Sequence, residues 1–210
     1  MADLTALIDY GAGNLHSVHN ALNAVGANVV VTDDPVTVAK ADRIVLPGVG
    51  AYRTCANGLR GIDGMVEAME QRVLAEGAPF LGICVGMQLL ATRGLEHGET
   101  PGLNWIPGDV VAIERTDPLL RVPHMGWNEV EATTDHPLLP RGGVGAGHAY
   151  FVHSYCFDPA DPSVVAATCT YGEAFPALIA RGNVAGTQFH PEKSQGYGIA
   201  LLSRFLEWCP

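Results

Sequence analysis

The strongest constraint on the fold is an alternation of strand-like and helix-like segments in the N-terminal half. Apolar runs at 4–9, 28–32, 43–46 and 79–83 have the length and composition of buried strands. Between these runs, apolar residues recur at spacings of three and four, as on one face of a helix. Because parallel strands need helical crossovers, this order predicts an α/β fold with an open, mostly parallel central sheet and helices on both faces.

Capping residues mark the expected helix starts. Asn14, Asp34 and Asp63 carry short polar side chains that can accept hydrogen bonds from free N–H groups at a helix start. Pro35 fits the first position of a short helix after Asp34. The apolar residues expected on the buried faces are Leu15, Val18, Leu22 and Val25 in the first helix, and Met65, Val66, Met69 and Val73 in the third.

The sequence becomes β-rich after about residue 105. Short β-prone runs lie at 110–113, 127–130, 149–155, 164–170, 177–180 and 184–189, separated by proline and glycine. A last helix is expected to bury Ile199, Leu202, Phe205 and Leu206. Since there is no repeat and no linker, we expect a single domain over residues 1–210.

Charge and composition exclude several classes of partner. The net charge of −10 argues against nucleic acid and anionic membranes as partners, and no apolar stretch is long enough to span a bilayer. The five cysteines are scattered and form no CxxC pair, so we expect free thiols in the cytoplasm.

A glycine-rich loop at 9–14 follows the first strand, where a dinucleotide-binding fingerprint would lie. The third glycine of that fingerprint would fall on His16, so we expect no dinucleotide cofactor and instead a tight loop at the ligand-binding edge of the sheet. His16 and His19 share a predicted helix face but have no third ligand nearby, which predicts no metal.

The segment 82–86 (GICVG) places Cys84 between a strand and a helix, with a glycine two residues away on each side. This is the pattern of a nucleophile elbow, a turn too sharp for neighbouring side chains. The start of the helix would also favour the thiolate. Taken alone, the segment also fits a tight turn around an inert buried cysteine.

A base and an acid follow in the segment 188–192 (QFHPE). If His190 and Glu192 lie on a strand, residues two apart point the same way and address one site. Alone, a histidine before proline also fits a plain strand end. Together, Cys84, His190 and Glu192 predict an acyl-transfer triad.

Two further segments have more than one interpretation. Residues 47–50 (PGVG) can aim a backbone N–H at a substrate carbonyl, or can form a plain strand-ending turn. Residues 122–128 (VPHMGWN) fit either a core segment or an interface patch.

Taken together, these motifs resemble the triad-type (class I) glutamine amidotransferases. The resemblance runs from end to end through 9–14 (DYGAGN), 46–51 (LPGVGA), 82–90 (GICVGMQLL), 122–128 (VPHMGWN), 151–155 (FVHSY) and 186–195 (GTQFHPEKSQ). It implies glutamine hydrolysis without a cofactor, with Cys84 as nucleophile, His190 as base and Glu192 as orienting acid. It also implies an oxyanion hole from the N–H groups of Val49 and Val85. The implied substrate-binding residues are Gly48, Gly50, Gln88, Glu96, His153, Ser154 and Tyr155.

The strings PHMGWN and HPEKSQ are similar to the histidine-pathway branch of that family. This implies a heterodimer with a (β/α)8-barrel synthase that receives the ammonia, with Trp127, Tyr155 and Lys193 at the interface. Two alternatives stay open: a glutaminase that serves anthranilate or pyridoxal phosphate synthesis, and a non-catalytic scaffold with a decayed site. The string PHMGWN argues against the other glutaminases. A decayed scaffold would usually have lost Cys84, His190 or Glu192, and all three are present.

Overall fold

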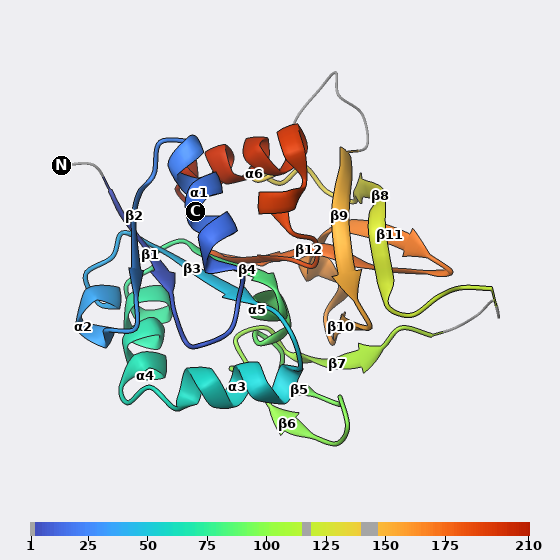
Figure 1. The fold of residues 1–210 in the computed structure, drawn as a ribbon, viewed down its shortest axis with the longest axis horizontal. Helices are drawn as coiled ribbons and strands as arrows, with labels where there is room; N and C mark the ends of the chain where they lie inside the picture. Colours follow the sequence, from blue (N-terminus) through green and yellow to red (C-terminus); the bar gives the residue numbers. More distant parts are fainter. Residues whose placement is uncertain (1–2, 115–118, 140–146) are drawn as a thin grey trace.

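The computed structural model describes residues 3–114, 119–139 and 147–210, and these form a mixed sheet of nine strands between helices (Figure 1). The strand order is β2-β1-β3-β4-β13-β12-β11-β8-β9. The first five strands are parallel: β2 (Asn28–Thr32), β1 (Leu4–Ile8), β3 (Arg43–Gly48), β4 (Phe80–Cys84) and β13 (Val184–Thr187). The other four run antiparallel: β12 (Glu173–Arg181), β11 (Val165–Tyr171), β8 (His124–Ala132) and β9 (Gly147–His153). The predicted α/β fold is confirmed, and the sheet is parallel only from β2 to β13.

Helices cover both faces of the parallel part (Figure 1). They are α1 (Leu15–Ala24), α2 (Pro35–Val38), α3 (Tyr52–Arg60), α4 (Met65–Glu70), α5 (Val85–Gln88) and α6 (Gln195–Glu207). A π-helical segment, Gln71–Ala75, continues α4. Helices α1 and α6 pack together on one face, and α3 and α4 contact each other on the opposite face. Within the described ranges, no helix is long and apolar enough to cross a membrane.

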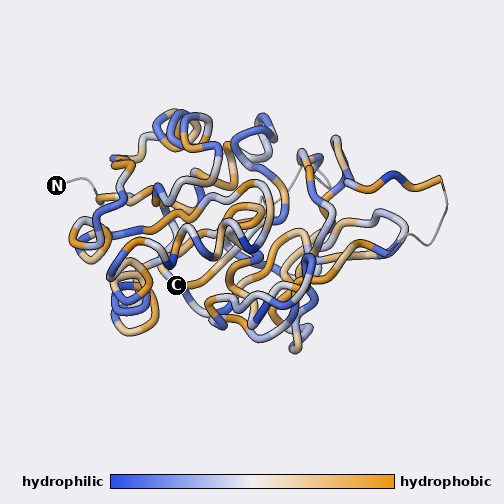
Figure 2. Tube along the Cα trace, turned by 60° about the horizontal axis from the view of Figure 1, so that its bottom comes forward, coloured by the Kyte–Doolittle hydropathy of each residue, from blue (hydrophilic) through white to orange (hydrophobic). Residues whose placement is uncertain are grey.

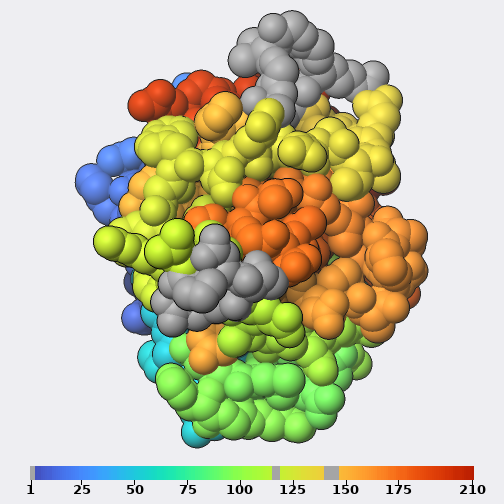
Figure 3. Space-filling model, turned by 90° about the vertical axis from the view of Figure 1, so that its right-hand side faces the viewer, coloured from blue at the N-terminus to red at the C-terminus, as the bar shows by residue number. Residues whose placement is uncertain are grey.

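A smaller sheet joins β10 (Tyr155–Pro159), β7 (Gly108–Ala112), β5 (Arg93–Gly94) and β6 (Thr100–Pro101). Short 3-10 helices lie at Pro162–Val164 and Pro191–Lys193. Figure 3 shows that residues of the second half of the chain form most of the end of the molecule farthest from the N-terminus, with green segments from the middle of the chain below them. Along the outer helices, hydrophobic and hydrophilic residues alternate, as expected for elements with one buried face (Figure 2).

The helix starts differ in part from the predictions. Asp34 caps α2 as expected, accepting from the N–H groups of Val36 and Thr37 at 3.0 and 3.2 Å. Asn14 stands at the N-cap of α1 but makes no side-chain capping bond. The cap predicted at Asp63 is wrong, because the chain enters α4 through Gly64 in a left-handed conformation, φ 77°.

Two helix predictions also need correction. Helix α3 was not predicted, although its buried residues Tyr52, Cys55, Ala56 and Leu59 recur at spacings of three and four. Helix α6 is present, but Ile199 is exposed and Leu206 is only partly buried. Its buried face runs instead through Gly198, Leu201, Leu202 and Phe205, because the helix is rotated slightly from the predicted orientation.

Candidate active site

Cys84 lies at the turn from β4 into α5, in the strand–turn–helix arrangement predicted for it. Its backbone has φ 55° and ψ −111°, a strained conformation for a residue other than glycine. A Cβ on Gly82 would lie 2.5 Å from the carbonyl oxygen of Gly86, and a Cβ on Gly86 would collide with the carbonyl oxygen of Leu46. The two glycines therefore let β3, β4 and α5 approach closely enough to form the elbow.

His190 and Glu192 are in direct contact. His190 Nδ1 lies 2.8 Å from Glu192 Oε1, and both side chains are almost completely buried. The strand predicted for this segment is wrong, because β13 ends at Thr187 and His190 directly precedes the 3-10 helix Pro191–Lys193. A single tight turn, rather than strand alternation, brings the two side chains together.

The surroundings of His190 favour its protonated form. Burial lowers the pKa of the imidazole, but the nearby Cys84 and the hydrogen-bonded carboxylate of Glu192 outweigh burial and raise the pKa to about 9. Since Nδ1 is bonded to Glu192, Nε2 is the nitrogen left for Cys84. The arrangement suits transfer of the thiol proton to His190, which leaves a nucleophilic sulfur.

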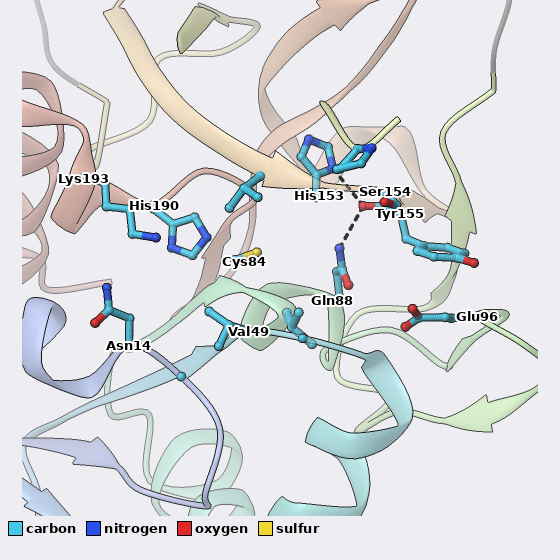
Figure 4. A pocket seen from close by; sticks show the side chains of 15 residues that line it. Asn14, Val49, Cys84, Gln88, Glu96, His153, Ser154, Tyr155, His190 and Lys193 are labelled. Atoms are coloured by element: carbon cyan, nitrogen blue, oxygen red, sulfur yellow. Dashed lines mark hydrogen bonds between the residues drawn. The ribbon is translucent and has the colours of Figure 1, made fainter. Parts of the chain in front are cut away.

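Cys84 and His190 line a pocket of about 620 Å³ (Figure 4). The expected site residues that line it are Val49, Gly50, Cys84, Val85, Gln88, Glu96, His153, Ser154, Tyr155, His190 and Lys193. Glu192 and Gly48 are expected site residues that do not line it: Glu192 is bonded to His190, and Gly48 ends β3 directly before Val49. The structure thus brings nearly all of the residues predicted for the site to one cavity.

The segment 47–50 is held from both sides. Tyr10 donates its hydroxyl to the carbonyl of Pro47 at 2.6 Å, and the Cys55 thiol donates to the carbonyl of Val49 at 3.3 Å. Gly48 is packed so closely that a Cβ there would lie 2.7 Å from the backbone nitrogen of Gly86. Gly50 has φ 92°, which favours glycine. The peptide between residues 48 and 49 therefore lies between two anchored carbonyls at the edge of the pocket.

Two polar side chains in the pocket are oriented by backbone groups. Gln88 Nε2 donates to the carbonyl of Tyr155 at 2.9 Å. Glu96 accepts from the N–H of Tyr52, the first residue of α3, at 2.6 Å. Figure 4 shows both side chains across the pocket from His190. This arrangement offers an amide and a carboxylate to a polar ligand that reaches Cys84.

Two of the expected interface residues, Tyr155 and Lys193, line the pocket, and Trp127 shares its neighbour Tyr150 with Lys193. Trp127 is 46% exposed, and its ring meets the ring of Tyr150 edge-on at 6.1 Å. Lys193 is also exposed, with Nζ 5.7 Å from the centre of the Tyr150 ring. Tyr155 lies at the other end of the pocket (Figure 4).

Some pocket residues were absent from the predicted set. Gly13 and Asn14 belong to the glycine-rich loop that was predicted to lie at a ligand-binding edge, so their signal was present. Pro123 and Val152 also line the pocket, and they lie in or beside motifs quoted above. Gln188, which contacts Cys84, had no separate signal. Within the described residues, no group of three His, Cys, Asp or Glu side chains could hold a metal ion.

Comparison with known proteins gives a consistent result. The family described as "Glutamine amidotransferase class-I" matches residues 6–208. The chain is 56% identical to "Imidazole glycerol phosphate synthase subunit HisH" of Zymomonas mobilis over 98% of this chain and 96% of the relative. It is 54% identical to the protein of the same name from Rhodospirillum rubrum, over 98% of this chain and 99% of the relative.

Solved structures are similar in fold at lower identity. A structure described as a glutamine amidotransferase matches with a TM-score of 0.72 and 22% identity, over 96% of this chain and 97% of that one. The structure of PurLQS from Thermotoga maritima matches with a TM-score of 0.73 and 17% identity, over 99% and 98%. At these identities the likeness concerns the fold alone.

Proposed function

The chain belongs to the class I glutamine amidotransferases and, within them, to the HisH subunits of imidazole glycerol phosphate synthase, and from this membership we propose how it works. Cys84 hydrolyses glutamine to glutamate and ammonia, and the ammonia passes to a synthase partner. The observation that carries this proposal is the contact between His190 and Glu192 beside Cys84 at the pocket. A decayed scaffold would have no reason to keep all three groups buried together.

The reaction follows from the positions of the three groups. His190 takes the proton of the Cys84 thiol, and the sulfur attacks the side-chain amide carbon of glutamine. The C–N bond breaks, and His190 returns the proton to the leaving ammonia while a thioester remains on Cys84. Water then attacks the thioester as His190 takes its proton, the C–S bond breaks with its electron pair returning to sulfur, and glutamate leaves. Glu192 keeps the imidazole oriented and stabilises its positive charge.

Negative charge on the amide oxygen needs two donors. The N–H of Val85 opens α5 directly after the nucleophile, where a helix start favours negative charge. The N–H of Val49 is the second donor, supplied by the 47–50 segment. Each such donor is worth about 3–4 kcal/mol in the transition state.

The rest of the pocket holds the substrate. Glu96 offers a carboxylate for the ammonium group of glutamine, and Gln88 offers a side-chain amide for its polar groups. The backbone of His153, Ser154 and Tyr155, with that of Gly48 and Gly50, shapes the remaining wall. Within the described residues, the five cysteines are all unpaired, which supports the proposal of a reducing cytoplasm.

The partner is a (β/α)8-barrel synthase that uses the ammonia to make imidazole glycerol phosphate and an aminoimidazole carboxamide ribotide. Trp127, Tyr155 and Lys193 meet that barrel. The exposure of Trp127 and Lys193, and the position of Tyr155 and Lys193 in the lining of the pocket, support this placement. The names of the relatives favour this partner over synthases that make anthranilate or pyridoxal phosphate.

The test is glutamine hydrolysis by the chain alone, with the barrel partner, and with the partner and its nucleotide ligand. We expect glutamate production to rise with partner and ligand, and Cys84→Ala to abolish it while the complex still forms. A glutamine-like electrophile should label Cys84 before the other four cysteines. Hydrolysis that persists in Cys84→Ala, or labelling of another cysteine first, would contradict the proposal.

A further inference from the structure

Gln188 is a buried polar residue that the mechanism above does not use. It follows β13 and is fully buried, although its side chain carries both a donor and an acceptor. Its Nε2 lies 3.8 Å from Cys84 Sγ, in the geometry of a hydrogen bond to sulfur. A buried amide aimed at the nucleophile needs an explanation, because burying polar groups costs free energy unless they are bonded.

The orientation of the Gln188 amide is fixed by its neighbours. A carbonyl can only accept, so the bond of 2.9 Å to Tyr155 requires Gln88 to present its NH₂ group there. The same NH₂ group donates to Gln188 Oε1 at 3.1 Å. Because Gln188 must therefore present its oxygen to Gln88, its own NH₂ group faces the sulfur.

The Tyr155 carbonyl is itself held by a buried pair of histidines. His153 Nδ1 donates to it at 2.9 Å (Figure 4), which leaves His153 Nε2 to accept from His124 Nδ1 at 3.1 Å. Asn128 Nδ2 then donates to His124 Nε2 at 3.3 Å. Burial lowers the pKa of His153 to about 3 and that of His124 to about 4, so both stay neutral near neutral pH. The donor and the acceptor of each of these hydrogen bonds are therefore determined. Two residues of the 122–128 motif, His124 and Asn128, take part in them.

We propose that Gln188 is a further catalytic residue, whose side-chain N–H stabilises the sulfur of Cys84 when the sulfur is negatively charged. This inference rests on the proposed function, in which Cys84 is the nucleophile. When the thiol proton moves to His190, the electron pair stays on sulfur and accepts the Gln188 N–H. During attack that pair becomes the C–S bond, and when water breaks the thioester the pair returns to sulfur. Gln188 thus acts both when the thioester forms and when it is hydrolysed.

The test measures thiol reactivity without glutamine. The rate of Cys84 alkylation by iodoacetamide is followed against pH by peptide mass spectrometry, on the full chain and on two isosteric variants. Gln188→Met removes the donor, and Gln188→Glu places a negative charge beside the sulfur. Since a hydrogen bond to a charged group is worth roughly tenfold or more, the pH midpoint of alkylation should rise by about one unit in Gln188→Met. It should rise further in Gln188→Glu.

Thr187→Val is the matched control. Thr187 directly precedes Gln188, and its hydroxyl donates a buried hydrogen bond of 3.0 Å to the carbonyl of Phe189. The substitution removes this bond and leaves the Gln188 amide and the sulfur unchanged. Its midpoint should equal that of the wild type. In turnover with the partner, Gln188→Met should lower kcat about tenfold and change KM less, because Gln88 loses its bond to Gln188 but keeps its bond to the carbonyl of Tyr155.

The outcomes separate this inference from the proposed function. An unchanged midpoint in Gln188→Met, or an equal rise in Thr187→Val, would overturn the role of Gln188. If circular dichroism shows that Gln188→Met is unfolded, Gln188→Glu is read instead, and an unchanged midpoint there would overturn it equally. A wild-type complex without glutaminase activity would contradict the proposed function, while the alkylation midpoints would still test Gln188.

Discussion

At the scale of single residues, the chemistry of the site depends on how Cys84 and Glu192 change the proton affinity of His190. Burial alone would lower the pKa of this imidazole, and only its two partners raise it to about 9. The carboxylate therefore does more than orient the imidazole, because together with Cys84 it raises the pKa of His190 and so extends the pH range over which His190 keeps its proton. Glu192 nevertheless acts through His190 and does not itself transfer a proton.

We therefore predict that Glu192→Gln keeps more activity than His190→Ala, because losing the base removes proton transfer altogether. In Glu192→Gln the pKa of His190 should fall, since a charged partner is replaced by a neutral one. The alkaline limb of kcat/KM against pH, set near pH 9 by loss of the His190 proton, should move to lower pH. Steady-state rates from pH 6 to 10 measure both effects. A Glu192→Gln rate below that of His190→Ala would require a more direct role for Glu192.

The sequence was informative about these residues because their chemistry is local. Glycines around Cys84 report a turn that tolerates no Cβ, and the contacts at Gly82 and Gly86 give the reason. Gln188 could not be found in the same way. Its importance comes from contacts with Cys84 and Gln88, each about a hundred residues away along the chain, and no local pattern encodes them.

At the scale of elements, the elbow depends on close packing between β3, β4 and α5. We predict that Gly86→Ala lowers the free energy of unfolding by about 3 kcal/mol or more, because the new Cβ meets the carbonyl oxygen of Leu46 and backbone cannot move aside cheaply. Gly196→Ala in α6 is the control, since a Cβ added there would have nothing within 4 Å of it. Urea unfolding of both variants measures the difference. Equal stability of the two variants would show that the elbow can relax.

The buried histidine pair of β8 and β9 gives a second prediction at this scale. His124 stacks on Tyr171 with ring centres 4.0 Å apart, and burial lowers its pKa to about 4. In the unfolded chain this histidine has a pKa of about 6.5. Between pH 6.5 and about pH 4, the unfolded chain therefore binds a proton that the folded chain does not. Folding stability should therefore fall with decreasing pH over this window, by about 1.4 kcal/mol per pH unit for this histidine.

His124→Phe should remove that contribution. The phenyl ring fits the same stack, so the variant should fold. It should be less stable at pH 7 because His153 loses its donor. Its stability should nevertheless depend less on pH between 6.5 and 4.5 than that of the wild type. Urea midpoints across this range provide the measurement, and parallel curves for the two proteins would refute the assignment.

The elements themselves were only partly predictable. Buried parallel strands are continuous apolar runs, which is why those of β1 to β4 could be found from composition. Helix α3 was missed because its apolar residues include a tyrosine, a cysteine and an alanine rather than a run of leucines. The turn at His190 was missed because a 3-10 helix of three residues has too little sequence to show a period.

At the scale of the whole molecule, the site exists because β13 pairs with β4 in parallel. This pairing brings the end of the strand that carries Cys84 beside the segment that carries His190. The alternation of strands and helices predicted the parallel part of the sheet. The partner strands of the short β-rich runs depend on contacts far along the chain, so the antiparallel part was not predicted. The buried apolar side chains of the described residues form one cluster, which supports the single domain that stays a prediction.

The whole molecule also decides whether the site is active. We predict that the isolated chain is a poor glutaminase, and that in it the peptide between Gly48 and Val49 has its N–H turned away from the oxyanion. Both flanking carbonyls are anchored, by Tyr10 and Cys55, so this one peptide can turn without moving the segment.

Docking of the proposed barrel partner with its nucleotide would favour the turned form by differential contact. Since one missing donor costs a factor of about 10² to 10³ in turnover, latency of that size needs no larger rearrangement. Val49→Pro removes the donor and should stay slow even in the complex, whereas Val49→Ala keeps the N–H and should respond to the partner like the wild type. Turnover of the chain, the complex and the complex with ligand measures the switch. Equal rates in all three states would mean that the oxyanion hole is already formed in the isolated chain, and that docking controls ammonia transfer rather than the chemistry at Cys84.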